Sequence, residues 1–234
     1  MATTTIPKTP VTRSTRTTVA MKVLMAVTGS LLVLFLIVHM YGNLKMFAGA
    51  EPFNDYAHHL RELGEPMLPY SGFLWIFRIV LLGAILGHMF SAFHLWSRAK
   101  SARTQRYARS RKLQQTYASR TMRWGGVIIL LFIIFHLLQF TTRTIEVGGD
   151  YADVEPYEMV IMGFSNPFVV LFYALAVIAV GFHLRHGIWS ATQTLGLTSQ
   201  SNRNAVNLVA VTISLAVTLG FLTVPIAVLA GIVD

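Results

Sequence analysis

Five long apolar stretches take up most of this chain of 234 residues, and they constrain its fold more than any other feature. Each is close to the roughly 20 apolar residues that a helix needs to cross a lipid bilayer. A hydrophobic content of 54% with only 12% charged residues excludes an ordinary water-soluble domain. We therefore predict an all-α integral membrane protein with five transmembrane helices. The expected spans are residues 22–44, 71–96, 123–140, 167–189 and 205–232.

The beginning of the chain differs in composition from the rest. Residues 1–20 are rich in Thr and contain no apolar run, so they do not resemble a cleaved signal peptide. We interpret them as a polar cytoplasmic tail, and residues 21–234 as a single transmembrane domain. The chain has no cysteine, which excludes disulfides, thiolate catalysis and an iron–sulfur cluster held wholly by its own residues. Imidazole is then the strongest metal ligand available.

The net charge of +9 is concentrated beside particular spans. Basic residues precede the first and fifth spans, and nine lie from Arg98 to Arg123, where no acid occurs. All ten acidic residues fall in the other connections or at Asp234. By the positive-inside rule the basic segments and the N-terminus face the cytoplasm, and the acidic segments face outward. This distribution favours contact with membrane lipids and docking of a cytoplasmic partner, and it argues against nucleic-acid binding.

One histidine lies deep inside each of the first four spans: His39, His88, His136 and His183. An ionisable side chain within the membrane usually has a function. At about 1.5 Å per residue, His39 and His136 lie roughly 24 and 20 Å from the inner ends of their helices, and His88 and His183 roughly 12 and 9 Å. The four therefore form an outer and an inner pair. Each pair comes from two parallel helices that lie diagonally in an up-down four-helix bundle.

Two opposed imidazoles at one level are the axial ligands that a six-coordinate haem iron needs. Zinc is disfavoured because no level gathers three or four ligands. A single membrane histidine is more often a packing residue, but the paired depths favour ligands. His186 competes with His183, since it follows three residues later on nearly the same helix face. Depth favours His183, and spacing alone does not decide between them.

Several short segments agree in order and spacing with one known group of proteins. They are residues 28–29 and 39–44 in the first span, 53–56 after it, 135–136 followed by Arg143, and 182–190 followed by 193–196. With them the chain resembles, over residues 21–232, the five-helix dihaem cytochrome b (b558-type) subunit of succinate dehydrogenase and fumarate reductase, which is respiratory complex II. The resemblance implies that His88 and His183 bind the haem nearer the cytoplasm. It likewise implies that His39 and His136 bind the outer haem.

The resemblance also implies a function and partners. It indicates the membrane anchor of a succinate:quinone oxidoreductase, which is not catalytic alone and binds a flavoprotein subunit and an iron–sulfur subunit on the cytoplasmic face. Electrons from succinate would pass through two haems b to a quinone, menaquinone by resemblance, near the outer face. The implied location is a bacterial cell membrane, and a higher oligomer of the complex is compatible with it.

Polar residues near the expected haems could support this function. Arg78, inside the second span, is the candidate partner of the outer haem propionates, because an intramembrane arginine needs an anion. The candidates near the inner haem are His94, Arg185, His186 and Gln193. Quinone chemistry at the outer face needs protons, for which Glu62, Glu65 and Arg143 are chemically suitable. Ordinary loop solvation explains these last three equally well.

Other functions could use the same features. The anchor of a hydrogenase or formate dehydrogenase would keep both haems, and only the wider resemblance argues against it. A haem-free transporter would use the histidines as a proton relay. That alternative predicts carboxylates within the helices and interrupted spans, and the sequence has neither. A purely structural anchor predicts that one pair lacks a histidine, and none is lacking.

Overall fold

The computed structural model describes residues 17–101 and 117–234, with the backbone alone for residues 117–121. All regular secondary structure in this part of the chain is helical. Its elements are α1 (Thr18–Leu44), η1 (Lys45–Ala48), α2 (Ala50–Glu62), α3 (Gly72–Ser101), α4 (Tyr117–Phe140), α5 (Pro156–Phe164), α6 (Pro167–Thr194) and α7 (Arg203–Leu229). Five of them are long and apolar enough to cross a membrane: α1 together with η1, α3, α4, α6 and α7. The predicted five-helix membrane fold is confirmed.

The membrane helices extend beyond the apolar stretches, mainly at the ends that the charge distribution predicts to face the cytoplasm, which we call the inner ends. α1 begins at Thr18, where the Thr17 hydroxyl accepts a hydrogen bond from the Ala20 amide at 3.1 Å. α6 continues to Thr194, and Gly196 follows with a φ of 74°, a conformation that favours glycine. Hydropathy marks where a chain leaves the lipid, whereas the cap decides where the helix stops. Residues 18–20 therefore belong to a helix, and the rest of the predicted tail lies almost wholly outside the described residues.

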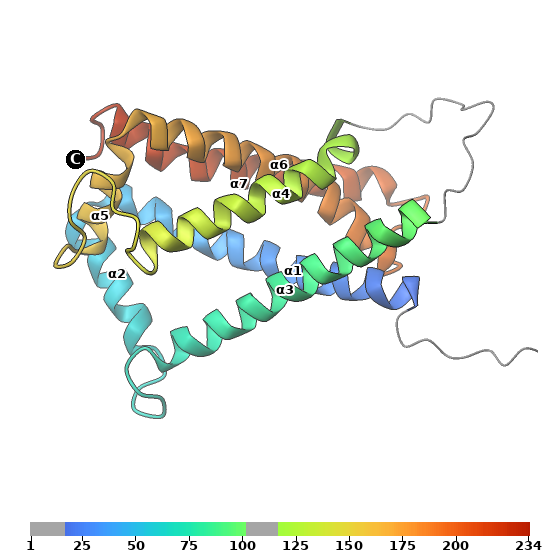
Figure 1. Ribbon diagram of the computed structural model, residues 1–234, viewed down its shortest axis with the longest axis horizontal. Helices are drawn as coiled ribbons and strands as arrows, with labels where there is room; N and C mark the ends of the chain where they lie inside the picture. The colour runs from blue at the N-terminus through green and yellow to red at the C-terminus, as the bar shows by residue number, and fades with distance from the viewer. Residues whose placement is uncertain (1–16, 102–116) are drawn as a thin grey trace, which may run out of the picture.

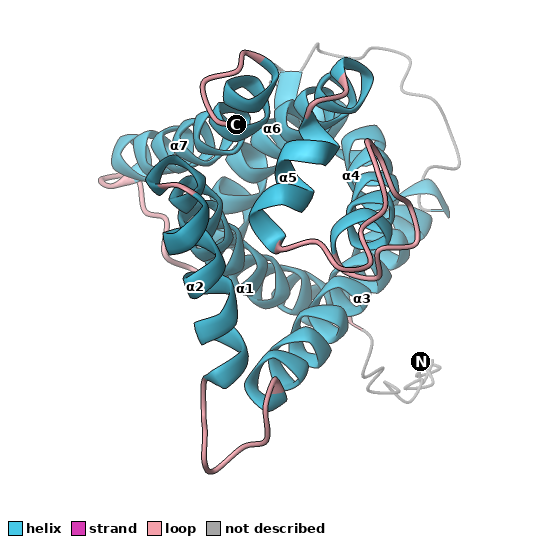
Figure 2. Ribbon diagram, turned by 90° about the vertical axis from the view of Figure 1, so that its left-hand side faces the viewer, coloured by secondary structure: helices cyan, strands magenta, loops and turns pink. Residues whose placement is uncertain are grey.

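Four of the long helices surround a common interior, in the neighbouring order α3, α1, α6 and α4 (Figures 1 and 2). α1 packs against α3 and α6, and α4 packs against α6. α7 lies outside this group, against α6 and α1. The close approach of α6 and α7 depends on Gly181, because a Cβ there would collide with the Thr218 hydroxyl. Small residues of this kind let membrane helices pack tightly.

The outer end of the bundle is closed by two short helices that the sequence analysis did not predict. Figure 1 shows α2 and α5 at the same end as the C-terminus. Here η1, α5, α6 and α7 meet in an apolar core that includes Met46, Phe164, Tyr173 and Val224. A hydrogen bond of 3.2 Å joins His58 Nε2 on α2 to the carboxylate of Glu155, the residue before α5. The short helices thus cap the interior on the side of the outer histidines.

The outward faces of the long helices are apolar. Leu34, Ile79, Trp124 and Leu208 are 65%, 65%, 73% and 66% exposed, respectively. Such a surface is unfavourable in water, but it matches the hydrocarbon of a bilayer. The hydrocarbon offers no hydrogen-bond partners, so the polar side chains within the spans need partners in the interior of the bundle.

Candidate functional site

The outer histidine pair lies between α1 and α4. The ring centroids of His39 and His136 are 5.8 Å apart, and the ring planes make an angle of 77°. Phe35 stacks on His39 at 5.1 Å, and Phe140 lies 5.6 Å from His136 between ring centroids. These aromatic side chains keep water away from the pair.

The inner pair lies between α3 and α6. The ring centroids of His88 and His183 are 6.1 Å apart, and their planes make an angle of 62°. The structure therefore brings together both pairs that the depth argument matched. Of the two competing histidines on α6, His183 is the one opposite His88, while His186 lies about one turn further along and is partly buried.

The spacing of both pairs suits a metal ion between two imidazoles. A bond of about 2 Å on each side, with the radius of each ring added, places the centroids roughly 6 Å apart. Within the described residues, no group of three or more His, Asp or Glu is arranged to hold a metal. Each pair thus offers two imidazoles, the number of protein ligands that a six-coordinate haem iron would require. The residues fit haem in ligand type, number and spacing.

Hydrogen bonds orient two of the four imidazoles. His88 Nδ1 lies 3.1 Å from the main-chain carbonyl of Met25 on α1, and His136 Nδ1 lies 3.2 Å from the Tyr173 hydroxyl. Because a carbonyl only accepts, His88 Nδ1 is the donor, and Nε2 keeps the lone pair that can bind a metal. His183 Nδ1 is buried and has no hydrogen-bond partner among the residues that the structure describes.

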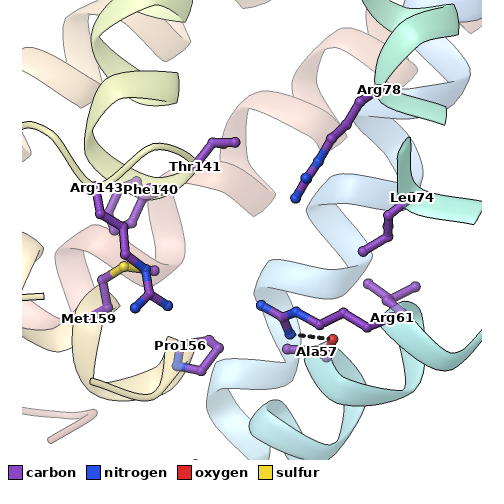
Figure 3. A pocket seen from close by; sticks show the side chains of 10 residues that line it. Ala57, Arg61, Leu74, Arg78, Phe140, Thr141, Arg143, Pro156 and Met159 are labelled. Carbon is purple, nitrogen blue, oxygen red and sulfur yellow. Dashed lines mark hydrogen bonds between the residues drawn. The ribbon is translucent and has the colours of Figure 1, made fainter. Parts of the chain in front are cut away.

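A cavity of about 230 Å³ lies at the outer end, and Phe140, one turn beyond His136, is among its lining residues. Figure 3 shows three arginine side chains around it: Arg61 from α2, Arg78 from α3 and Arg143 from the loop after α4. Arg61 and Arg143 each donate to a main-chain carbonyl at 2.8 Å. None of the described residues that line the cavity is acidic. Its lining is therefore strongly cationic and suits carboxylate groups.

Two of the three residues predicted for quinone chemistry lie apart from this cavity. Glu62 is the last residue of α2, and Glu65 lies in the turn that follows. Both are exposed, and neither lines the cavity, whereas Arg143 does. The structure therefore brings Arg143 close to Arg78 and leaves the two carboxylates at the surface.

The inner candidates differ in burial. His94 on α3 stacks on Phe90 with 6.1 Å between ring centroids, and its buried Nε2 has no hydrogen-bond partner within the described part of the chain. Arg185 and Gln193 on α6 are exposed, and His186 is partly buried. His94 is thus the inner candidate that carries an unsatisfied polar atom.

Two polar side chains beside the outer pair were missed by the sequence analysis. The Tyr173 hydroxyl donates to Gln139 Oε1 at 2.8 Å, and both residues are buried. An amide within an apolar span is a signal that could have identified Gln139. Tyr173 has no comparable signal, because a tyrosine in such a run is also typical of interior packing.

Comparisons with known proteins identify the family. Residues 94–221, which are more than half of the chain, match the family described as succinate dehydrogenase/fumarate reductase transmembrane subunit. The succinate dehydrogenase cytochrome b558 subunit of Bacillus subtilis (strain 168) is 27% identical over 165 residues, which cover 70% of this chain and 73% of that protein. No solved structure matches the chain. This protein therefore belongs to the family of succinate dehydrogenase/fumarate reductase transmembrane subunits.

Proposed function

We propose that this chain anchors a succinate:quinone oxidoreductase to the membrane and connects its cytoplasmic subunits to a quinone through two haems b. The observation that carries the proposal is the presence of two close histidine pairs in one helical bundle. The ring centroids are 5.8 Å apart in the outer pair and 6.1 Å apart in the inner pair. The relative from Bacillus subtilis is named a cytochrome b558 subunit, which supports haem b as the ligand.

In this proposal His39 and His136 bind the outer haem iron, and His88 and His183 bind the inner one. When bound, each haem supplies a one-electron couple within the bilayer. Two imidazoles would hold each iron, and this disfavours oxygen binding there. The protein residues also orient the imidazoles and keep water out, and these are the means by which a protein tunes a cofactor.

We assign the outer cavity to the propionates of the outer haem and to the quinone head group. Arg78 lines this cavity as the predicted propionate partner, and Arg61 adds a second guanidinium. An arginine within a membrane span needs an anion, and the described lining residues supply none. Arg143 is the proposed contact for the quinone, by resemblance menaquinone. Exposed Glu62 and Glu65 are the proposed proton donors at the same face.

The opposite end of the bundle is the proposed docking side. There His94, through its unpaired Nε2, is the proposed propionate partner of the inner haem. Arg185, His186 and Gln193 are the further candidates on α6. A flavoprotein subunit and an iron–sulfur subunit would bind on this side, against the basic segment 98–123, whose central part lies outside the described residues. The proposed location is the cytoplasmic membrane of a bacterium.

A reduced-minus-oxidised spectrum with pyridine-haemochrome quantitation, made on the purified complex, tests the proposal. We expect two low-spin b haems per chain. His39→Ala should remove one haem and His88→Ala the other, because each removes an axial ligand of a different pair. His58→Ala is the matched control: this histidine is exposed and paired with Glu155, and its loss should leave both haems in place.

A protein without haem, or with a single haem that survives both substitutions, would contradict the proposal. The histidines would then be assigned to packing or to a proton relay. The anchor of a hydrogenase or formate dehydrogenase would give the same spectrum, but membership of the family disfavours that alternative.

A further inference from the structure

Tyr173 occupies a distinctive place beside the outer histidine pair. It lies on α6, is only 4% exposed, and is surrounded by phenylalanine rings, the nearest being Phe164 at 4.9 Å and Phe132 at 5.0 Å between centroids. Its hydroxyl is therefore a single polar atom in an apolar environment, where an unpaired polar group is costly. It contacts two partners, Gln139 Oε1 at 2.8 Å and His136 Nδ1 at 3.2 Å.

The hydrogen bond from the Tyr173 hydroxyl to Gln139 Oε1 sets the direction of the other hydrogen bond in this group. A phenol carries one proton, and here Tyr173 gives it to the carbonyl oxygen of Gln139. Towards His136 the hydroxyl can then only accept, so Nδ1 must carry the imidazole proton and Nε2 must carry the lone pair. The reverse order would place the proton on Nε2 and prevent it from binding a metal. Gln139 thus acts on His136 through Tyr173.

The two histidine pairs differ in the nearest partner of Nδ1. Within the inner pair, His88 Nδ1 lies 3.1 Å from the main-chain carbonyl of Met25, which no substitution of a side chain removes. The Thr28 hydroxyl, which donates to the Leu24 carbonyl, lies further away at 3.3 Å. Within the outer pair, the acceptor is a side chain whose own proton is already engaged, and such an acceptor is strengthened by the second hydrogen bond. A stronger acceptor at Nδ1 makes the imidazole more basic and favours the oxidised metal.

We propose that Tyr173 and Gln139 are positioning residues that fix the tautomer of His136 and lower the midpoint potential of the outer haem. The inference rests on the proposed function, because it requires haem at the outer pair. These two side chains would make the midpoint potential of the outer haem differ from that of the inner haem, although both have two histidine ligands.

Redox titration of both haems in the purified complex tests this inference, with the low-spin EPR signals as a second readout. Tyr173→Phe keeps the ring and removes the acceptor, so we expect the midpoint potential of the outer haem to rise and its EPR signal to shift. The inner haem should keep its values. The outer haem is identified as the one that His136→Ala removes.

Two further variants separate this role from a purely structural one. Gln139→Leu should raise the same potential by less, since Tyr173 remains, and the double variant should equal Tyr173→Phe alone, because Gln139 acts only through the hydroxyl. Tyr151→Phe is the matched control. Its hydroxyl is also buried, but it donates to the Val147 carbonyl at 2.8 Å, so both potentials should stay unchanged.

Unchanged potentials and EPR signals in Tyr173→Phe, with both haems bound, would overturn the inference and leave the proposed function intact. So would a shift of equal size in Tyr151→Phe. Loss of the outer haem alone from both Tyr173→Phe and Gln139→Leu, with the inner haem and the helix content retained, would support it, provided that Tyr151→Phe keeps both haems. Absence of haem from the unaltered protein would instead refute the proposed function itself.

Discussion

At the scale of single residues, Gly29 shows how one helix makes room for the functional side chain of another. A Cβ at this position on α1 would lie 3.2 Å from Cε1 and 3.4 Å from Nδ1 of His88 on α3. The same imidazole is hydrogen-bonded to Met25, one turn before Gly29. The ring of His88 is therefore confined by α1 both through a hydrogen bond and through the absence of a side chain.

We expect Gly29→Ala to weaken the inner haem site. The added methyl group pushes His88 away from its place, and overpacking of this kind costs about 1–3 kcal/mol. That energy corresponds to a roughly five- to 150-fold loss of haem affinity. Haem content and the spectrum of the inner haem measure the effect, and the outer haem should be unaffected.

Gly87→Ala provides the control for this prediction. It lies on the same α1–α3 interface, where a Cβ would make an ordinary contact of 3.5 Å with Thr28. If both variants lose the inner haem equally, crowding of the helix interface rather than displacement of His88 is responsible.

At the scale of elements, the five long helices could be predicted because a run of apolar residues has few other stable folds. The short helices α2 and α5 could not. α2 contains six charged residues or histidines among its 13, and α5 has nine residues, so neither resembles a membrane span. They are stabilised by packing on the outer end of the bundle and on each other.

A hydrogen bond between α2 and α5 gives a structural role to residues 53–56, one of the segments on which the resemblance is based. Asn54 Oδ1, on α2, accepts from the Tyr157 amide at 3.0 Å, in the first turn of α5. One helix thus supplies the N-terminal cap of another, where the amides otherwise lack partners. The pattern of the sequence marks Asn54, but only the fold shows what it contacts.

We expect Asn54→Ala to destabilise the outer end without removing a haem. Loss of an N-terminal cap costs about 0.5–2 kcal/mol, and here it also loosens α2 from α5. Thermal unfolding of the complex should begin at a lower temperature, with haem content unchanged at room temperature. Asp55→Ala, an exposed neighbour, should change stability by less than about 0.5 kcal/mol. Equal effects of the two substitutions would contradict the capping role.

At the scale of the whole molecule, the sequence was sufficient to predict which histidines meet, because depth in a membrane follows directly from position along a helix. Lateral contacts do not follow in this way. Tyr173 reaches His136 from a neighbouring helix, and Arg61 reaches the outer cavity from a helix that was not predicted. Which faces of two helices touch depends on rotation and packing, and hydropathy carries little information about either.

The side of the molecule on which each charged segment lies also depends on the whole fold. The Tyr157 hydroxyl donates to the Asp234 carbonyl at 3.1 Å, so the end of the chain lies beside α5. Figure 1 shows α2, α5 and the C-terminus together at one end, and the connection between α6 and α7 at the other. The acidic segments therefore gather at the end of the molecule where α2 and α5 lie. By the positive-inside rule that end faces outward.

The absence of cysteine makes this orientation directly testable with single labels. Met67, 93% exposed between α2 and α3, and Ser201, exposed between α6 and α7, lie on opposite sides of the predicted membrane. A membrane-impermeant maleimide should label Met67→Cys in intact cells, and Ser201→Cys only in inverted vesicles or after permeabilisation. The reverse pattern would place the three arginines of the cavity on the cytoplasmic side. The outer histidine pair would then be the one nearer the soluble subunits, and the proposed quinone site would move to the opposite face.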